Sequence, residues 1–248
     1  MHDSMFFYGL LTATFLFAGM VKGVTGMGLP TVAMGLLGTV MPPAMAATLL
    51  VVPSFVTNVW QLFSGGAVAA LVLRLWPMLA AMVIGTVGGS ALLVRVDPRW
   101  SGFALGSALI VYAVYALLAP ALSIPRALEA WLSPLVGLVT GMVTGATGVF
   151  VMPAVPYLGA LGLHKDELVQ ALGLSFSIST LALAAGLLAN DAFRLNQLGL
   201  SSLSVIPALL GMWLGTRVRA RISPQRFRQC FLLLLLVLGL ELASRPFF

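Results

Sequence analysis

Two short segments with a shared Thr-Gly pattern interrupt apolar stretches of this sequence. The first reads Gly-Val-Thr-Gly-Met-Gly-Leu-Pro over residues 23–30, and the second reads Gly-Met-Val-Thr-Gly-Ala-Thr-Gly over residues 141–148, followed by Pro153. Glycine costs about 1 kcal/mol relative to alanine inside a helix, and proline removes a backbone donor. We therefore expect helices to break in these segments and to restart near Gly28 and Gly148.

A helix that restarts at such a break presents free N–H groups and the positive end of its dipole. Two such N-termini that meet in a membrane, together with threonine hydroxyls, would form a cradle for a small oxyanion. Lys22 would either add a full positive charge or extend its ammonium group to the membrane surface. The alternative for the breaks is close helix packing, with hydroxyls bonded to the preceding turn. The binding residues predicted here are Lys22, Thr25, Gly26, Gly28, Thr144, Gly145, Thr147 and Gly148.

Uncharged polar residues in two further apolar segments extend the predicted site. Ser54, Thr57, Asn58 and Gln61 recur at helical spacing, and a serine-rich group lies between residues 170 and 180. Donors without carboxylates suit an anion better than a metal cation, although hydrogen bonding between helices would use the same residue types. The sequence predicts no catalytic residue, no metal ligand and no cofactor. The additional substrate-binding residues predicted here are Asn58, Gln61, Ser175 and Ser179.

The elements that position these residues must lie in a membrane. Of the 248 residues, 60% are hydrophobic and 8% are charged, a balance that one water-soluble core of this size could not bury. The net charge of +6 comes from short basic clusters between apolar runs, so it indicates membrane topology rather than nucleic-acid binding. The single cysteine, Cys230, excludes an internal disulfide and a cysteine-based metal site.

About 20 apolar residues cross the hydrocarbon core of a bilayer. On this basis we predict an all-α polytopic membrane protein of about eight transmembrane helices, with the first and fifth units broken at glycines. A linker over residues 123–132 would separate two four-helix repeats, residues 1–122 and 133–248. The expected units cover residues 5–40, 44–63, 68–94, 102–122, 133–162, 168–189, 197–217 and 227–244.

The two halves share glycine and proline motifs at matching positions. A GxxxG motif at residues 85–89 recurs at residues 211–215, and Asp97-Pro98 recurs as Ser223-Pro224 at the same offset of 126 residues. The first and fifth units also match, with a shift of one residue. GxxxG motifs let two helix backbones approach closely. Because four units per half is an even number, we expect parallel repeats related by an axis along the membrane normal, unless a re-entrant hairpin changes the count.

Basic residues divide unequally between the two faces that alternating spans would produce. The face with more of them is expected to be cytoplasmic, which places both termini on the periplasmic side. Nine basic residues are expected on the cytoplasmic face: Lys22, Arg95, Arg99, Lys165, Arg217, Arg219, Arg221, Arg226 and Arg228. Four are expected on the other face: Arg74, Arg126, Arg194 and Arg245. The arginines of residues 217–228 are interpreted as a topology signal rather than an anion site.

Two four-helix halves, a Gly-x-Thr-Gly-x-Gly break after the first span and a Thr-Gly-x-Thr-Gly break in the fifth resemble the TauE/SafE family. The resemblance covers nearly the whole chain. It implies a multi-pass protein of the bacterial inner membrane that exports sulfite, sulfoacetate or related organosulfonates, and it does not fix one ligand. The break residues that it carries over are Thr25, Gly26, Gly28, Thr144, Gly145, Thr147 and Gly148.

We therefore expect an exporter of small sulfur-containing anions and not an enzyme. A metal or other cation transporter, suggested by 12 methionines, stays open, as does a membrane assembly protein that transports nothing. The expected partners are a small anionic substrate and the lipid bilayer, with no nucleic acid, and a homodimer is compatible with the sequence. No carboxylate lies near the middle of an expected span, so the sequence does not indicate a proton carrier.

Overall fold

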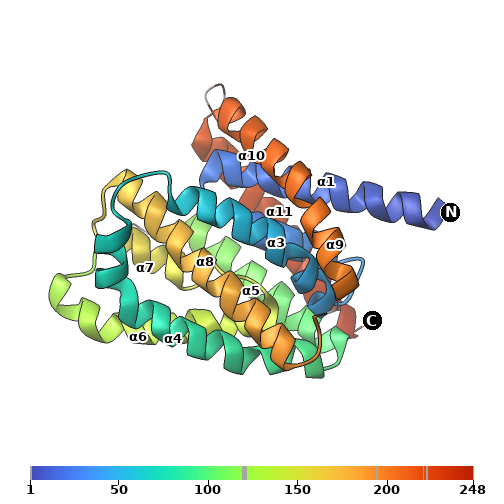
Figure 1. Ribbon diagram of the computed structural model, residues 1–248, viewed down its shortest axis with the longest axis horizontal. Coiled ribbons are helices and arrows are strands. Elements are labelled where there is room, and N and C mark those ends of the chain that lie inside the picture. Colours follow the sequence, from blue (N-terminus) through green and yellow to red (C-terminus); the bar gives the residue numbers. More distant parts are fainter. Residues whose placement is uncertain (1, 119–121, 194, 220, 222, 248) are drawn as a thin grey trace.

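The computed structural model describes residues 2–118, 122–193, 195–219, 221 and 223–247 of a helical chain (Figure 1). Eight of the helical segments in these residues are long and apolar enough to cross a membrane, which confirms the predicted fold class. The first half holds α1 (His2–Thr25), α2 (Leu29–Gly38), α3 (Pro43–Leu62), α4 (Val68–Arg95) and α5 (Pro98–Leu118). The second holds α6 (Arg126–Thr147), α7 (Ala154–Ala160), α8 (Lys165–Ala189), α9 (Leu195–Leu203), α10 (Val205–Arg219), α11 (Pro224–Ser244) and η1 (Arg245–Phe247).

Contacts between helix ends define one face of the molecule, which we call the arginine-rich face after residues 217–228. Arg228 at the start of α11 donates to the Ala116 carbonyl at the end of α5 (3.2 Å). The Ile124 N–H before α6 donates to the Ala160 carbonyl at the end of α7 (2.9 Å). The ends of α5, α7 and α10 therefore lie together, with the starts of α6 and α11.

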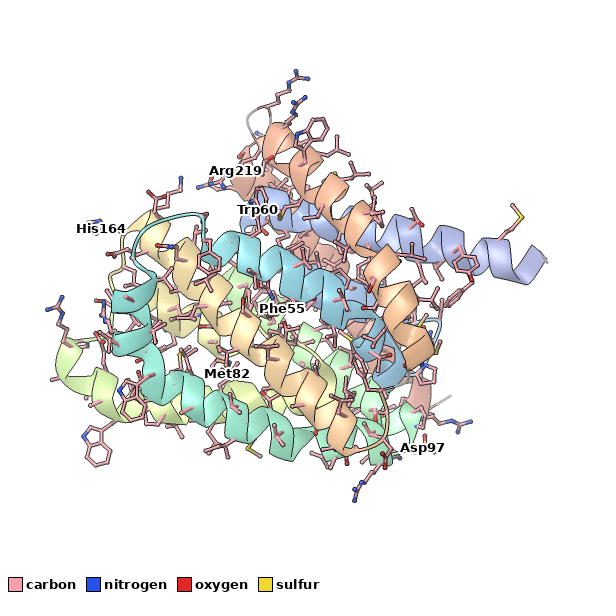
Figure 2. All side chains as sticks on the ribbon, viewed as in Figure 1. Phe55, Trp60, Met82, Asp97, His164 and Arg219 are labelled. Atoms are coloured by element: carbon pink, nitrogen blue, oxygen red, sulfur yellow. The ribbon has the colours of Figure 1, made fainter. Side chains whose placement is uncertain are left out.

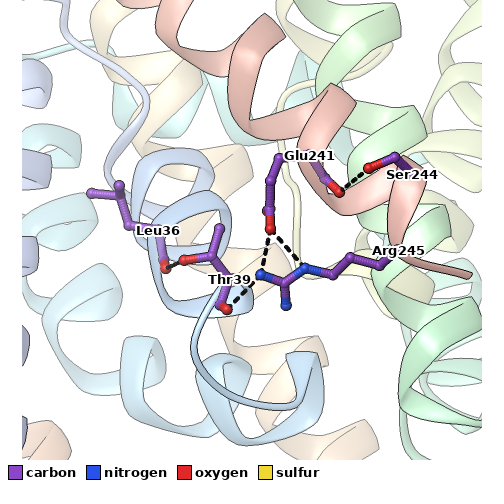
Figure 3. A network of polar contacts seen from close by, with 5 residues as sticks. All are labelled: Leu36, Thr39, Glu241, Ser244 and Arg245. Carbon is purple, nitrogen blue, oxygen red and sulfur yellow. Dashed lines mark hydrogen bonds and ion pairs between the residues drawn. The ribbon is translucent and has the colours of Figure 1, made fainter. Parts of the chain in front are cut away.

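The opposite face, here called the termini face, carries the end of α11. Arg245 donates through Nε to the Glu241 carboxylate (2.8 Å) and through Nη2 to the Thr39 carbonyl (2.7 Å), directly after α2 (Figure 3). α1 begins on this face as well (Figure 1), because Gly19 and Gly23 lie beside successive turns of α10, which runs toward the arginine-rich face.

A second arginine–glutamate pair lies on the arginine-rich face. Arg74 of α4 donates to both carboxylate oxygens of Glu129 on α6 (3.0 and 2.6 Å) and to the Leu161 carbonyl directly after α7 (3.2 Å). The two short helices α2 and α7 therefore each end at an arginine that a glutamate holds in place, one on each face.

The short helices α2 and α7 reverse the chain inside the membrane. The Gly26 carbonyl before α2 accepts a bond from Gln61 at the end of α3, and Gln61 also donates to Val169 near the start of α8. Thr39 after α2 lies on the termini face. α2 thus returns toward the face from which α1 came, and α7 returns to the arginine-rich face in the same way. Each half therefore crosses or re-enters the membrane region with five helical segments instead of four. Because five is an odd number, corresponding helices such as α1 and α6 run in opposite directions.

The condition attached to the parallel prediction, a re-entrant hairpin that changes the count, is therefore met. Each over-long apolar unit contains a returning helix, and the halves are not parallel. The reversal also moves four basic residues to the faces opposite those predicted. Arg74 and Arg126 lie on the arginine-rich face, while Arg95 and Arg99 lie toward the termini face, where Arg99 and Arg245 line one shallow pocket. Arg194 lies outside the described residues.

The halves interlock through their glycines. α1 packs along α10 and α4 packs along α6, so the first helix of each half lies against the third membrane-spanning segment of the other. A Cβ atom on Gly89 would lie 2.7 Å from the Met142 carbonyl oxygen, and one on Gly145 would lie 2.7 Å from the Ser90 backbone nitrogen. Only glycine fits at such distances. The division into residues 1–122 and 133–248 stays a prediction.

Gly89→Ala should lower the melting temperature of the detergent-solubilised protein, because overpacking against a backbone costs about 1–3 kcal/mol. Gly88→Ala is the matched control, since Gly88 is exposed and nothing lies within 4 Å of a Cβ atom there. The control should be neutral or stabilise by up to about 1 kcal/mol through helix propensity. Equal melting temperatures for the two variants in a thermal unfolding assay would contradict the close contact.

Candidate functional site

The first break is held together by its own threonine. α1 ends at Thr25, and Gly26 and Gly28 follow with φ angles of +79° and +98°, a region that favours glycine. The Thr25 hydroxyl lies 2.7 Å from the Met27 carbonyl and 2.9 Å from the Val21 carbonyl, and it accepts a bond from Met27 N–H (3.3 Å). The hydroxyl therefore stabilises the turn, and α2 begins directly after Gly28.

The second break repeats this geometry 122 residues later. Gly148 has a φ of +71°, and the Thr147 hydroxyl donates to the Val143 carbonyl (2.6 Å) and accepts from Val149 N–H (3.2 Å). The Gly148 N–H donates to the Thr144 carbonyl at 2.7 Å, as the Gly26 N–H does to the Lys22 carbonyl. Thr147-Gly148 thus corresponds to Thr25-Gly26, and Thr144 occupies the position that Lys22 holds in the first half.

Two expectations about the second break change. Gly145 lies inside α6 and packs against the backbone of α4, so it belongs to a helix contact and not to the break. Gly148 faces Met34, in the middle of α2, and a Cβ atom there would lie 2.9 Å from the Met34 sulfur. Because corresponding helices run in opposite directions, the two restarting helices open toward opposite faces and do not form the expected joint cradle.

Lys22 is buried between helices. Its side chain is 3% exposed, and its ammonium group donates to Asn58 Oδ1 and to the Thr57 hydroxyl (3.2 Å), both on α3. Asn58 in turn donates to the Thr180 hydroxyl on α8 (3.4 Å). Of the two alternatives for Lys22, the structure therefore has the charge inside the protein and not at the membrane surface.

The other predicted polar residues lie on the same two helices, α3 and α8. Gln61 Nε2 donates to the Gly26 carbonyl (2.9 Å) and to the Val169 carbonyl (3.0 Å), which ties the first break to both helices. Ser179 donates to the Met82 sulfur (2.8 Å). Buried polar groups are normally hydrogen-bonded. Within the described chain, three buried atoms here have no protein partner: the hydroxyls of Ser54 and Ser175 and the Oε1 atom of Gln61.

A cavity of about 550 Å³ opens on the arginine-rich face. Thr25 and Met27 of the first break line it, together with Tyr112 of α5 and the guanidinium-bearing residues Arg219 and Arg228. Arg219 lies at the end of α10 (Figure 2). The described lining includes none of the second-break residues. The cavity therefore joins the arginine-rich surface to one Thr-Gly break only.

The sequence interpretation missed Arg219, Arg228 and Tyr112 as candidate functional residues. The arginines were assigned to topology because they stand in a basic cluster between apolar runs, and that assignment does not conflict with a second role. Tyr112 carried no signal, since it and Tyr115 are the only polar side chains of residues 108–118 in an apolar span. Only the return of α7 toward α5 and α11 shows that these residues enclose one space.

Comparison with family models places the chain among known proteins. A model described as sulfite exporter TauE/SafE matches residues 11–242, nearly the whole sequence. The chain belongs to the TauE/SafE family. No curated protein and no solved structure gave a match. As a TauE/SafE protein with eight spans, it is a multi-pass membrane transporter and not an enzyme.

Thr25→Val should destabilise this TauE/SafE protein, because it removes the hydroxyl bonds that hold the first break, each with a net value of about 0.5–1.5 kcal/mol. Thr25→Ser keeps the hydroxyl and is the matched control. The measurement is the melting temperature of the purified protein in detergent. If the serine and valine variants melted together, the hydroxyl would not hold the turn.

Proposed function

We propose that this TauE/SafE member exports small sulfur-containing anions such as sulfite or organosulfonates. The observation that carries the proposal is the cavity on the arginine-rich face, with Arg219 and Arg228 in its wall and Thr25 at the break. Lys22 lies one turn before Thr25 and is buried against α3. Positively charged side chains therefore lie both in the wall of the cavity at the surface and in the interior, one turn from the first break.

The cavity suits an oxyanion in its charge. Guanidinium groups bind sulfur and phosphorus oxyanions through paired N–H donors. Clefts with one sign of charge raise the local concentration of oppositely charged ligands. The described residues of the lining include two arginines and no carboxylate, which favours an anion over the alternative of a metal or other cation.

The charge distribution supports an orientation. Most basic residues lie on the arginine-rich face, and cytoplasmic loops of membrane proteins carry an excess of lysine and arginine. We place this face in the bacterial cytoplasm and the termini in the periplasm. An anion that leaves a cell with a negative interior gains about 2.3 kcal/mol per charge per 100 mV, so export needs no separate energy source.

The proposed binding site keeps most of the residues predicted from the sequence and adds two arginines. Lys22, Asn58, Gln61, Ser175 and Ser179 form the buried polar region, and Thr25 links it to the cavity. The second-break residues Thr144, Thr147 and Gly148 would meet the substrate on its way to the termini face, and Gly26 and Gly28 shape the first break. Arg219 and Arg228 are the added residues.

Arg219→Gln should raise the half-saturating concentration of sulfite in counterflow across proteoliposomes by about tenfold, the low end of electrostatic focusing. Arg221→Gln is the matched control, since Arg221 is an exposed arginine of the same loop outside the cavity lining. The difference between the variants should shrink at high ionic strength, because salt screens exposed charges.

Counterflow of labelled sulfite by the wild-type protein is the primary test, with a labelled divalent metal as the competing cargo. Exchange of sulfite and not of the metal supports the proposal. Exchange of the metal alone would establish the cation alternative. Identical sulfite kinetics for Arg219→Gln and Arg221→Gln would remove the cavity from the route.

A further inference from the structure

We infer that Lys22 makes the transporter selective for singly charged sulfur oxyanions, for which it serves as the buried counter-charge between α1, α3 and α8. The inference rests on the proposed function and adds the net charge of the substrate. It distinguishes hydrogensulfite and monosulfonates from dianions such as sulfoacetate.

The charge balance around Lys22 is the first argument. Lys22 is the only charged side chain among the buried residues that the structure describes, and no described carboxylate lies within 4.0 Å of its ammonium group. Its two partners, Thr57 and Asn58, are neutral. An unpaired charge inside a membrane protein is strongly unfavourable. One negative charge cancels this cost, whereas two leave an uncompensated charge at the same depth.

The neutral groups around Lys22 give the second argument, because they leave binding capacity unused. Ser54 stands one turn before Asn58 on α3, so both lie on the same side of that helix. The Ser54 hydroxyl is buried without a protein partner. Sulfonate and sulfite oxygens accept hydrogen bonds from such hydroxyls, which add affinity without adding charge.

The comparison between halves gives the third argument. Backbone bonds of 2.7 Å place Thr144 where Lys22 stands in the first half, and Asn58 bonds to Thr180, which is itself 122 residues further along the chain. The junction of the halves therefore contains one lysine and one threonine in equivalent places. A second lysine would have matched a dianion, and threonine supplies only a neutral hydroxyl.

The first break lies between the cavity and Lys22 along the chain. Thr25 and Met27 line the cavity, Lys22 lies one turn before Thr25 on α1, and Gln61 donates to the carbonyls of Gly26 and Val169. The exposed arginines of the cavity are screened by water and salt, so they attract anions of either charge. Discrimination by charge therefore belongs to the buried lysine.

Two ligands of similar size test the inference. Isethionate carries a sulfonate and a hydroxyl, while sulfoacetate carries a sulfonate and a carboxylate. In counterflow of labelled sulfite by the wild-type protein, we expect isethionate to compete at a concentration at least roughly tenfold lower than sulfoacetate, which is a difference of about 1.4 kcal/mol. Equal competition, or preference for sulfoacetate, would overturn the inference.

Two substitutions assign the selectivity to Lys22. Lys22→Met should abolish the preference for isethionate and weaken competition by both ligands, and Lys165→Met, at the exposed lysine that begins α8, should leave both unchanged. Asn58→Asp supplies a carboxylate to the ammonium group and keeps the fold through an ion pair, so it should weaken isethionate competition at least roughly tenfold. Unchanged competition in Asn58→Asp would overturn the inference even if Lys22→Met failed to fold.

The outcomes separate the two proposals. A wild-type protein that exchanges no sulfur anion refutes the proposed function. A wild-type protein that exchanges sulfite but is inhibited equally by isethionate and sulfoacetate refutes only the selectivity of Lys22.

Discussion

Backbone polar groups inside a bilayer have no water to bond, so each must find a partner within the protein. A helix can be interrupted in a membrane only where other groups replace the lost bonds. Here Thr25 and Thr147 bond the carbonyls and N–H groups on either side of each break, and Gln61 takes the Gly26 carbonyl. The requirement explains why both breaks use threonine before glycine. The same requirement explains why α3 and α8 lie next to the first break, close to the buried lysine.

Hydropathy was sufficient to predict the number of spans, because that number depends on composition over about 20 residues. The Thr-Gly segments predicted helix restarts near Gly28 and Gly148; α2 begins at Leu29, whereas α7 begins only at Ala154. The direction of the halves was not predictable from composition, since α2 and α7 are as apolar as the spans they follow. Gly145 was assigned to a break because its contact with α4 depends on a helix far away in the sequence. For the same reason, no local pattern placed Arg219 in the same cavity as Thr25.

The glycine contacts explain why neither half is a self-contained unit. α1 lies along α10 and α6 lies along α4, so each half completes its packing only with a helix of the other. Lipid offers no hydrophobic drive for helix association, and close backbone approach supplies it instead. The interlocked arrangement brings both breaks and the polar stretches of α3 and α8 into one interior. Lys22 and Asn58 meet there although they belong to different helices.

The two arginine–glutamate pairs that hold the ends of α2 and α7 differ in their contact with water. The Arg74 and Glu129 side chains are 29% and 16% exposed, whereas those of Arg245 and Glu241 are 43% and 44% exposed. Ions in the surrounding medium weaken exposed pairs more than shielded ones. The Arg245–Glu241 pair, which holds the end of α2 at the termini face, is therefore more sensitive to salt concentration than the Arg74–Glu129 pair. The ionic composition of one compartment alone thus sets how firmly one of the two re-entrant helices is anchored.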